Sequence, residues 1–176
     1  MSDMMRKDLL DRLQRFDEAV DLTFDDDRTF RLIIVGGSAL ILLDTITRAT
    51  HDIDVLQVHP DLLHLLEMYD INTRVEAYIN FFPFNFDDRL KPIPIEGKRV
   101  SFFTASLEDI VIAKLSSNRD TDALDIQREE IIKALDWDLL EHLATAEDEI
   151  KQNMLNKDRY ADFKASYDRY VERFRP

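Results

Sequence analysis

The chain has 176 residues, 45% of them hydrophobic, and its 36 acidic and 23 basic side chains give a formal net charge of −13. This length suits one domain, and the hydrophobic content supports a buried core rather than a disordered chain. The chain has no cysteine, which excludes a disulfide framework, a thiol nucleophile and a zinc–thiolate site. The negative charge disfavours broad, nonspecific binding to nucleic acid, because phosphate backbones are repelled.

Residues 1–8 are polar and lack the apolar stretch of a signal peptide. No run in the sequence approaches the roughly 18 apolar residues that a membrane-spanning helix needs. We therefore expect a cytoplasmic protein that does not bind a membrane.

Hydrophobic spacing predicts an amphipathic helix over 3–22, with Leu9, Leu13 and Phe16 on one face. We interpret the acidic run 25–27 that follows as a solvated connection rather than a metal site, because such runs usually face water. After this run the pattern predicts a strand over 30–35, a helix over 38–46, a strand over 52–58, a helix over 60–68 and a helix near 73–81.

The second half of the chain is predicted to be mostly helical. Segments 89–95 and 99–103 are expected to pair as strands, and Ser106 is expected to cap a helix over 107–117 with Asp109 in the capping-box position. Further helices are predicted over 122–135, 137–154 and 157–174. The expected fold class is therefore α+β, with a small mixed β-sheet flanked by helices. We place a core domain at 1–126 and a helical C-terminal extension, packed on that core, at 127–176.

Two of the three glycines lie side by side in Gly36-Gly37-Ser38, between the strand over 30–35 and the helix that follows. Glycine at such a turn lets a ligand approach the backbone closely. The first N–H groups of the helix and the Ser38 hydroxyl are suitable donors for a phosphate.

Fifteen residues after Gly37 comes Asp52-Ile53-Asp54-Val55. Because side chains alternate along a strand, Asp52 and Asp54 are expected on one face. Two carboxylates on one face suit a hard cation such as Mg²⁺. The alternative is a plain strand end with two exposed aspartates, although aspartate is disfavoured in strands.

Together these residues resemble the signature of the DNA polymerase β-like nucleotidyltransferase superfamily. More narrowly, the chain is similar to a minimal bacterial branch of this superfamily that includes the AbiEii-type abortive-infection toxins. The similarity lies in Gly36-Gly37-Ser38-Ala39 and in residues 47–54. A second segment, within 106–126, supports the likeness. It contains a leucine followed by an acid, then a lysine, then an arginine–aspartate pair, as does the helical segment found downstream in those proteins. The resemblance implies a nucleotidyltransferase-type sheet and transfer of a nucleotidyl group from a nucleoside triphosphate to an RNA or protein acceptor. It also implies two Mg²⁺ ions at full activity and a cognate antitoxin protein as partner.

The resemblance assigns roles to particular residues. Asp52 and Asp54 would be catalytic and would hold the metal. The phosphates would be bound by Gly36, Gly37, Ser38, Arg48 and Lys114, while Asp122 and Asp125 are two further candidates. The plainer alternatives are a solvated lysine, a surface arginine, and acids that stabilise the start of a helix.

The superfamily usually takes a third carboxylate from a later strand, and no acid here follows the expected apolar–acid–apolar pattern. An alternative function is therefore a catalytically degenerate nucleotidyltransferase fold that binds or regulates. An aromatic stripe in the last predicted helix comprises Tyr160, Phe163, Tyr167, Tyr170 and Phe174. This stripe either packs onto its own domain or forms a homodimer or partner interface.

Overall fold

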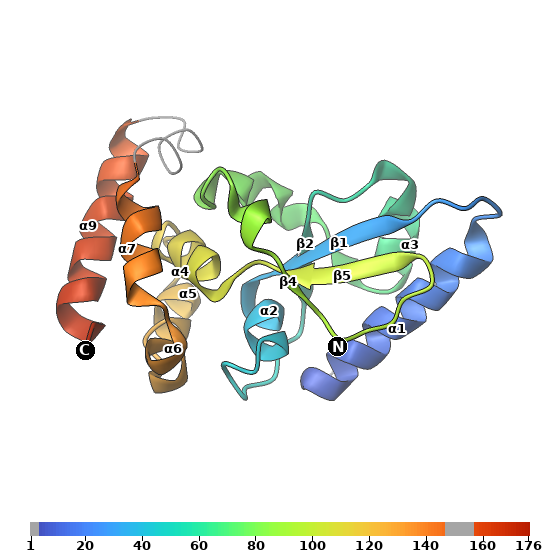
Figure 1. Cartoon of the computed structure of the whole chain (residues 1–176), viewed down its shortest axis with the longest axis horizontal. Helices are drawn as coiled ribbons and strands as arrows, with labels where there is room; N and C mark the ends of the chain where they lie inside the picture. The colour runs from blue at the N-terminus through green and yellow to red at the C-terminus, as the bar shows by residue number, and fades with distance from the viewer. Residues whose placement is uncertain (1–3, 147–156) are drawn as a thin grey trace. The chain divides into compact units, whose positions relative to one another are not determined.

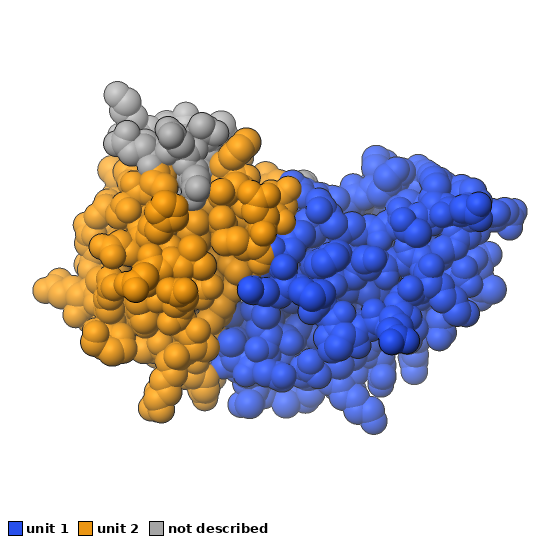
Figure 2. All heavy atoms as spheres, in the orientation of Figure 1, with its two compact units in different colours: residues 1–76, 90–105 blue, residues 77–89, 106–176 orange. Residues whose placement is uncertain are grey.

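The computed structural model describes residues 4–146 and 157–176, and its elements are shown in Figure 1. The chain divides into two compact units, which Figure 2 shows in different colours. Unit 1 comprises residues 1–76 and 90–105, and unit 2 comprises residues 77–89 and 106–176. The chain passes between the units at 76–77, 89–90 and 105–106, and the domain boundary predicted at 126–127 stays a prediction.

Unit 1 is built on a mixed five-stranded sheet in the order β3-β2-β1-β5-β4. The central strand β1 (Phe30–Val35) pairs antiparallel with β2 (Ile53–Leu56) and parallel with β5 (Val100–Thr104). The edge strands are β3 (Ile71–Asn72), parallel to β2, and β4 (Lys91–Pro92), antiparallel to β5. This mixed α+β architecture confirms the predicted fold class.

The helices of unit 1 pack against one another beside the sheet. The long helix α1 (Arg6–Thr23) contacts both α2 (Gly36–Leu42) and α3 (Leu63–Met68), and α2 packs against β1 and β2. The predicted face of α1 is buried, since Leu9, Leu13 and Phe16 have no exposed surface. Short 3₁₀ helices occupy Pro60–Leu62 in unit 1, Arg74–Phe81 at the change from unit 1 to unit 2, and Phe86–Arg89 in unit 2.

Asp17 is the one fully buried carboxylate on α1, and it joins this helix to the start of β5. Its two oxygens accept hydrogen bonds from the backbone amides of Lys98, Arg99 and Val100, each at 2.8 Å. The Arg99 guanidinium reinforces the junction by donating to Asp21 Oδ1 at 3.0 Å and to the Phe24 carbonyl at 2.6 Å. A side chain from α1 thereby satisfies amides that have no strand partner at this point.

Unit 2 is helical in its described part and comprises α4 (Leu107–Leu115), α5 (Asp120–Asp125), α6 (Glu129–Ala134), α7 (Trp137–Thr145) and α9 (Lys157–Phe174). Helix α4 lies at its centre and contacts α5, α7 and α9. Ser106 caps α4 as predicted, because its hydroxyl accepts from the Asp109 amide at 3.1 Å. The Asp109 carboxylate departs from the capping-box pattern and instead accepts from the Ser106 hydroxyl and from Arg89.

The aromatic stripe of α9 belongs to the core of unit 2. Phe163, Tyr167 and Tyr170 are buried, and Trp137 of α7 stacks on Tyr170. The Tyr170 hydroxyl donates to the Ile126 carbonyl at 2.6 Å, and burial raises the pKa of this phenol. Packing onto its own unit therefore accounts for most of the stripe.

Three predicted elements differ from the structure in their bounds or type, and one strand was not predicted. The helix predicted over 38–46 begins at Gly36 and ends at Leu42, so the glycine pair forms its first turn. The helix predicted near 73–81 is a 3₁₀ helix, and the strand predicted over 52–58 is limited to Ile53–Leu56. Strand β3 has two residues, too few for a hydrophobic period.

The helix predicted over 122–135 is broken into α5 and α6. Ile126 and Ile131 are both buried, yet residues five positions apart lie about 140° from each other around a straight helix. The break between them lets both side chains reach the core. The helix predicted over 137–154 ends at Thr145, and positions 147–154 lie outside the described residues.

We expect Asp17→Asn to lower the free energy of unfolding by about 2 kcal/mol, because an amide NH₂ replaces one acceptor and leaves a buried N–H unpaired. Urea denaturation measures the change. Glu18→Gln, an exposed neighbour on the same helix, is the matched control and should change stability little. Equal stabilities of the two variants would contradict the role given to Asp17.

Candidate functional site

Gly36 and Asp54 are in close contact at the end of the central strand pair. Val35 and Asp54 are register partners, so Asp54 lies beside the first turn of α2. Gly36 has a φ of +70°, and a methyl group on its α-carbon would lie 2.9 Å from Asp54 Oδ2. Only glycine accepts this conformation and this approach without strain.

Gly37 makes room for Arg48 in the same way. A methyl group at Gly37 would lie 2.8 Å from Arg48 Nη2. Arg48 is half-buried, and its Nη1 donates to the Ala49 carbonyl at 3.2 Å. The loop that carries Arg48 is held by paired backbone hydrogen bonds between Met4 and Thr50. The structure thus brings a guanidinium, two glycines and a carboxylate to one end of the sheet.

Ser38 is buried, and its hydroxyl already has a hydrogen-bond partner within the first turn of α2. Its side chain is 1% exposed, and its hydroxyl donates to the Val35 carbonyl at 3.1 Å. In this arrangement Ser38 stabilises the first turn of α2.

Asn72 is the site residue that the sequence analysis missed. It lies on β3 at the register of Asp54, and its Nδ2 donates to Asp54 Oδ1 at 2.8 Å. Its own Oδ1 accepts from the Arg74 amide at 3.0 Å. The only available signal was an isolated Ile71-Asn72 pair after a helix, which specifies neither a strand nor its register.

Asp52 lies just before β2, is exposed, and lines a hollow of about 610 Å³. The hollow is lined by acidic, basic, uncharged polar and apolar residues. They are Asp52, Leu63, Glu67, Asp70, Ile71, Asn72, Thr73 and Arg74. Asp52 and Asn72 therefore share one open space within unit 1. Its volume is in the range of small-molecule sites.

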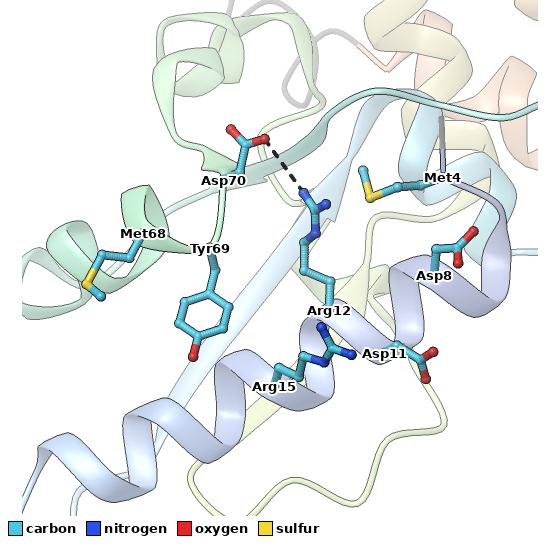
Figure 3. Close-up of a pocket in the computed structure, with 8 residues that line it drawn as sticks. All are labelled: Met4, Asp8, Asp11, Arg12, Arg15, Met68, Tyr69 and Asp70. Atoms are coloured by element: carbon cyan, nitrogen blue, oxygen red, sulfur yellow. Dashed lines mark ion pairs between the residues drawn. The ribbon is translucent and has the colours of Figure 1, made fainter. Parts of the chain in front are cut away.

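A second hollow of unit 1, of about 450 Å³, lies over α1 and is drawn in Figure 3. Arg12 extends from α1 toward Asp70, and the two charged groups are 3.8 Å apart. Asp70 lines both hollows. The Arg12–Asp70 pair thus fixes the residue that precedes β3.

Lys114, Asp122 and Asp125 form a buried ion cluster within unit 2. Lys114 Nζ contacts Asp122 Oδ1 at 2.7 Å and Asp125 Oδ2 at 3.1 Å, and the lysine is 7% exposed. Ser117 donates to the second oxygen of Asp122. Burial alone would raise the pKa of Asp122, but the charge of Lys114 and the hydrogen bonds from Lys114 and Ser117 outweigh it and lower that pKa.

Within residues 4–146 and 157–176, no three His, Cys, Asp or Glu side chains are grouped to hold a metal ion. A hydrogen bond joins the Asn72 amide to Asp54 at the sheet end, and Asp52 lines the neighbouring hollow together with Glu67 and Asp70. None of the described helices has the length and apolar character to cross a membrane.

A family model described as a nucleotidyltransferase of unknown function (DUF6036) matches residues 11–175. This range includes the glycine pair, both aspartates, Asn72 and the ion cluster of unit 2. No curated protein and no solved structure matches the chain.

We expect Lys114→Met to lower the free energy of unfolding by about 3 kcal/mol, because the buried Asp125 and the partly buried Asp122 lose their closest cation. Urea denaturation measures this, and Asp122→Asn with Asp125→Asn in the Lys114→Met background should restore part of the loss. Lys133→Met is the matched control, because Lys133 pairs with Glu129 at the surface. Unchanged stability with lost nucleotide affinity would instead assign Lys114 to the triphosphate.

Proposed function

The chain belongs to a family of nucleotidyltransferases of unknown function, and on this premise we propose a Mg²⁺-dependent nucleotidyltransferase whose catalytic carboxylates are Asp52 and Asp54. The enzyme would move a nucleotidyl group from a nucleoside triphosphate to an RNA or protein acceptor. The observation that carries the proposal is the glycine pair, which admits the Asp54 carboxylate and the Arg48 guanidinium to the backbone at one end of the sheet.

The donor set fits a magnesium ion. Asp52 and Asp54 offer carboxylate oxygens, and Mg²⁺ is commonly bound through one or two carboxylates together with substrate phosphates. The hydrogen bond from Asn72 would orient Asp54 for this task. When bound, the metal would neutralise charge on the triphosphate and on the reacting phosphoryl group.

The phosphates would be held by Arg48 and by the backbone at Gly36 and Gly37. A guanidinium can donate two parallel hydrogen bonds to phosphate oxygens. Ser38 would contribute a hydroxyl after exchanging its hydrogen bond to Val35. Lys114, Asp122 and Asp125 would contribute only if their ion cluster opened.

The reaction would begin with an acceptor hydroxyl directed at the α-phosphorus. The hydroxyl would lose its proton to solvent as its oxygen forms the new P–O bond, the bond from the α-phosphorus to the bridging oxygen would break, and pyrophosphate would leave. The hollow beside Asp52 would receive the acceptor. The net charge of −13 favours a short RNA end or a protein hydroxyl over a long RNA.

Asn72 also favours a second candidate, a protein that binds nucleotide without transferring it. An amide, not a carboxylate, faces Asp54 from the neighbouring strand, and among the described residues no three His, Cys, Asp or Glu side chains are grouped to hold a metal ion. Binding without release of pyrophosphate would identify this candidate. A cognate antitoxin remains a proposed partner, supported by the resemblance to abortive-infection toxins, and a homodimer remains a proposal that rests on the aromatic stripe of the last helix.

We expect Asp52→Ala with Asp54→Ala to abolish Mg²⁺-dependent nucleotide binding while the fold is retained. Titration calorimetry with each nucleoside triphosphate, with and without Mg²⁺, measures binding, and circular dichroism checks the fold. Asp87→Ala with Asp88→Ala removes the same charge from an exposed segment of unit 2 and serves as control. A folded double variant with unchanged affinity would refute the site.

We expect Gly37→Ala to weaken nucleotide binding about tenfold, because the new methyl group displaces Arg48 from its position beside the backbone. The thermal midpoint should fall only slightly, since the side-chain end of Arg48 can move. Calorimetry and thermal denaturation are measured on the same sample. If binding were as tight as in the unaltered protein, Arg48 would not be a phosphate ligand.

A further inference from the structure

Unit 2 contains a hollow of about 340 Å³ among α4, α5 and α9. The residues around it combine cations, small polar groups and apolar groups. They are Lys114, Leu115, Ser117, Ala123, Ile126, Gln127, Ser166, Arg169, Tyr170, Arg173 and Phe174. All of them belong to unit 2.

The charge of this hollow is opposite to that of the whole chain. Three basic residues line it, and among the described residues no carboxylate does, although the chain carries a formal charge of −13. Concentrated positive potential in a concave surface attracts anions. The hollow is therefore suited to an anionic ligand.

The two arginines supply the charge that a ligand can use. Lys114 is already neutralised by Asp122 and Asp125. Arg169 and Arg173 are one helical turn apart on α9, both are exposed, and neither pairs with a carboxylate within the described part of the chain. Residues four apart lie on the same face of a helix, so the two arginines are placed side by side along the hollow.

The remaining wall of the hollow gives the ligand a second property. Arg169 Nη2 is 3.3 Å from Ser166 Oγ, which keeps this guanidinium at the rim. Leu115, Ala123 and Ile126 provide apolar surface, and the half-exposed Phe174 ring adds an aromatic group. A ligand with a phosphate at one end and a flat, partly apolar group at the other would match both parts.

We propose that this hollow binds the phosphomonoester of a nucleoside monophosphate, either as the free nucleotide or as the phosphorylated end of an RNA. A phosphomonoester carries almost two negative charges at neutral pH, and paired arginines are suited to phosphate oxygens. Binding needs no metal, because cations line the hollow. Neither Asp52 nor Asp54 lines the hollow, so AMP binding should not require the two carboxylates proposed for nucleotidyl transfer.

The test is titration calorimetry of the full chain with AMP in the absence of Mg²⁺. Arg169→Gln with Arg173→Gln should weaken AMP binding at least tenfold, while adenosine should bind neither protein. Lys164→Gln is the matched control, since it removes a positive charge from α9 at a position paired with Asp168. The Asp52→Ala, Asp54→Ala protein should bind AMP normally.

The phosphomonoester can belong to a free nucleotide or to an RNA end. Binding of a 5′-phosphorylated RNA oligonucleotide, compared with its 5′-hydroxyl counterpart, distinguishes these two sources. Tighter binding of the phosphorylated RNA than of AMP would identify an RNA end, and weaker binding would identify the free nucleotide. The proposal is overturned if neither AMP nor phosphorylated RNA binds, or if the arginine variant binds them unchanged. It is also overturned if adenosine or inorganic phosphate binds as tightly as AMP, or if AMP binding is lost with Asp52 and Asp54.

Discussion

The buried carboxylate of Asp17 holds unit 1 together at the point on which its site depends. By accepting three backbone amides at the start of β5, it fixes that strand against α1. Strand β5 then pairs with β1 along its length, and β1 ends at the glycine pair. A shift of this junction would move the turn that lies against Asp54.

Close approach, rather than a long binding loop, creates the candidate site. Gly36 and Gly37 are placed where side chains would collide with Asp54 and Arg48, so each glycine has a steric reason in the fold. Asn72 completes the arrangement from a two-residue strand. The site thus consists of three short segments that lie side by side: the glycine pair, the segment from Arg48 to Asp54, and strand β3. Backbone pairing holds each of them in place.

The two units present opposite charges at their candidate sites. Unit 1 presents carboxylates at the end of its sheet, where a divalent cation would be needed to accept a polyphosphate. Unit 2 neutralises its buried carboxylates with Lys114 and presents Arg169 and Arg173 at an open hollow. On the two proposals above, this acidic protein would offer two local environments for phosphate, one through a metal and one through arginine.

The sequence by itself determined the features that depend on neighbouring residues. The periodicity of α1, the Ser106 cap, the strand before the glycine pair, the antiparallel pairing of β4 with β5, and the final helix were all predictable, and so was the α+β class. The glycine pair and the Asp52–Asp54 spacing also identified candidate site residues, since motif residues are read at fixed separations along the chain.

Only the tertiary structure decided which distant groups meet. It placed Asn72 against Asp54, Asp17 against the start of β5, and Lys114 between two aspartates. It also buried Ser38 and divided one predicted helix into α5 and α6. These outcomes depend on strand register and on which side chains share a core, and neither is encoded in a local pattern. A lysine, an asparagine or a serine has the same local propensity whether its partner is water or a side chain many residues away.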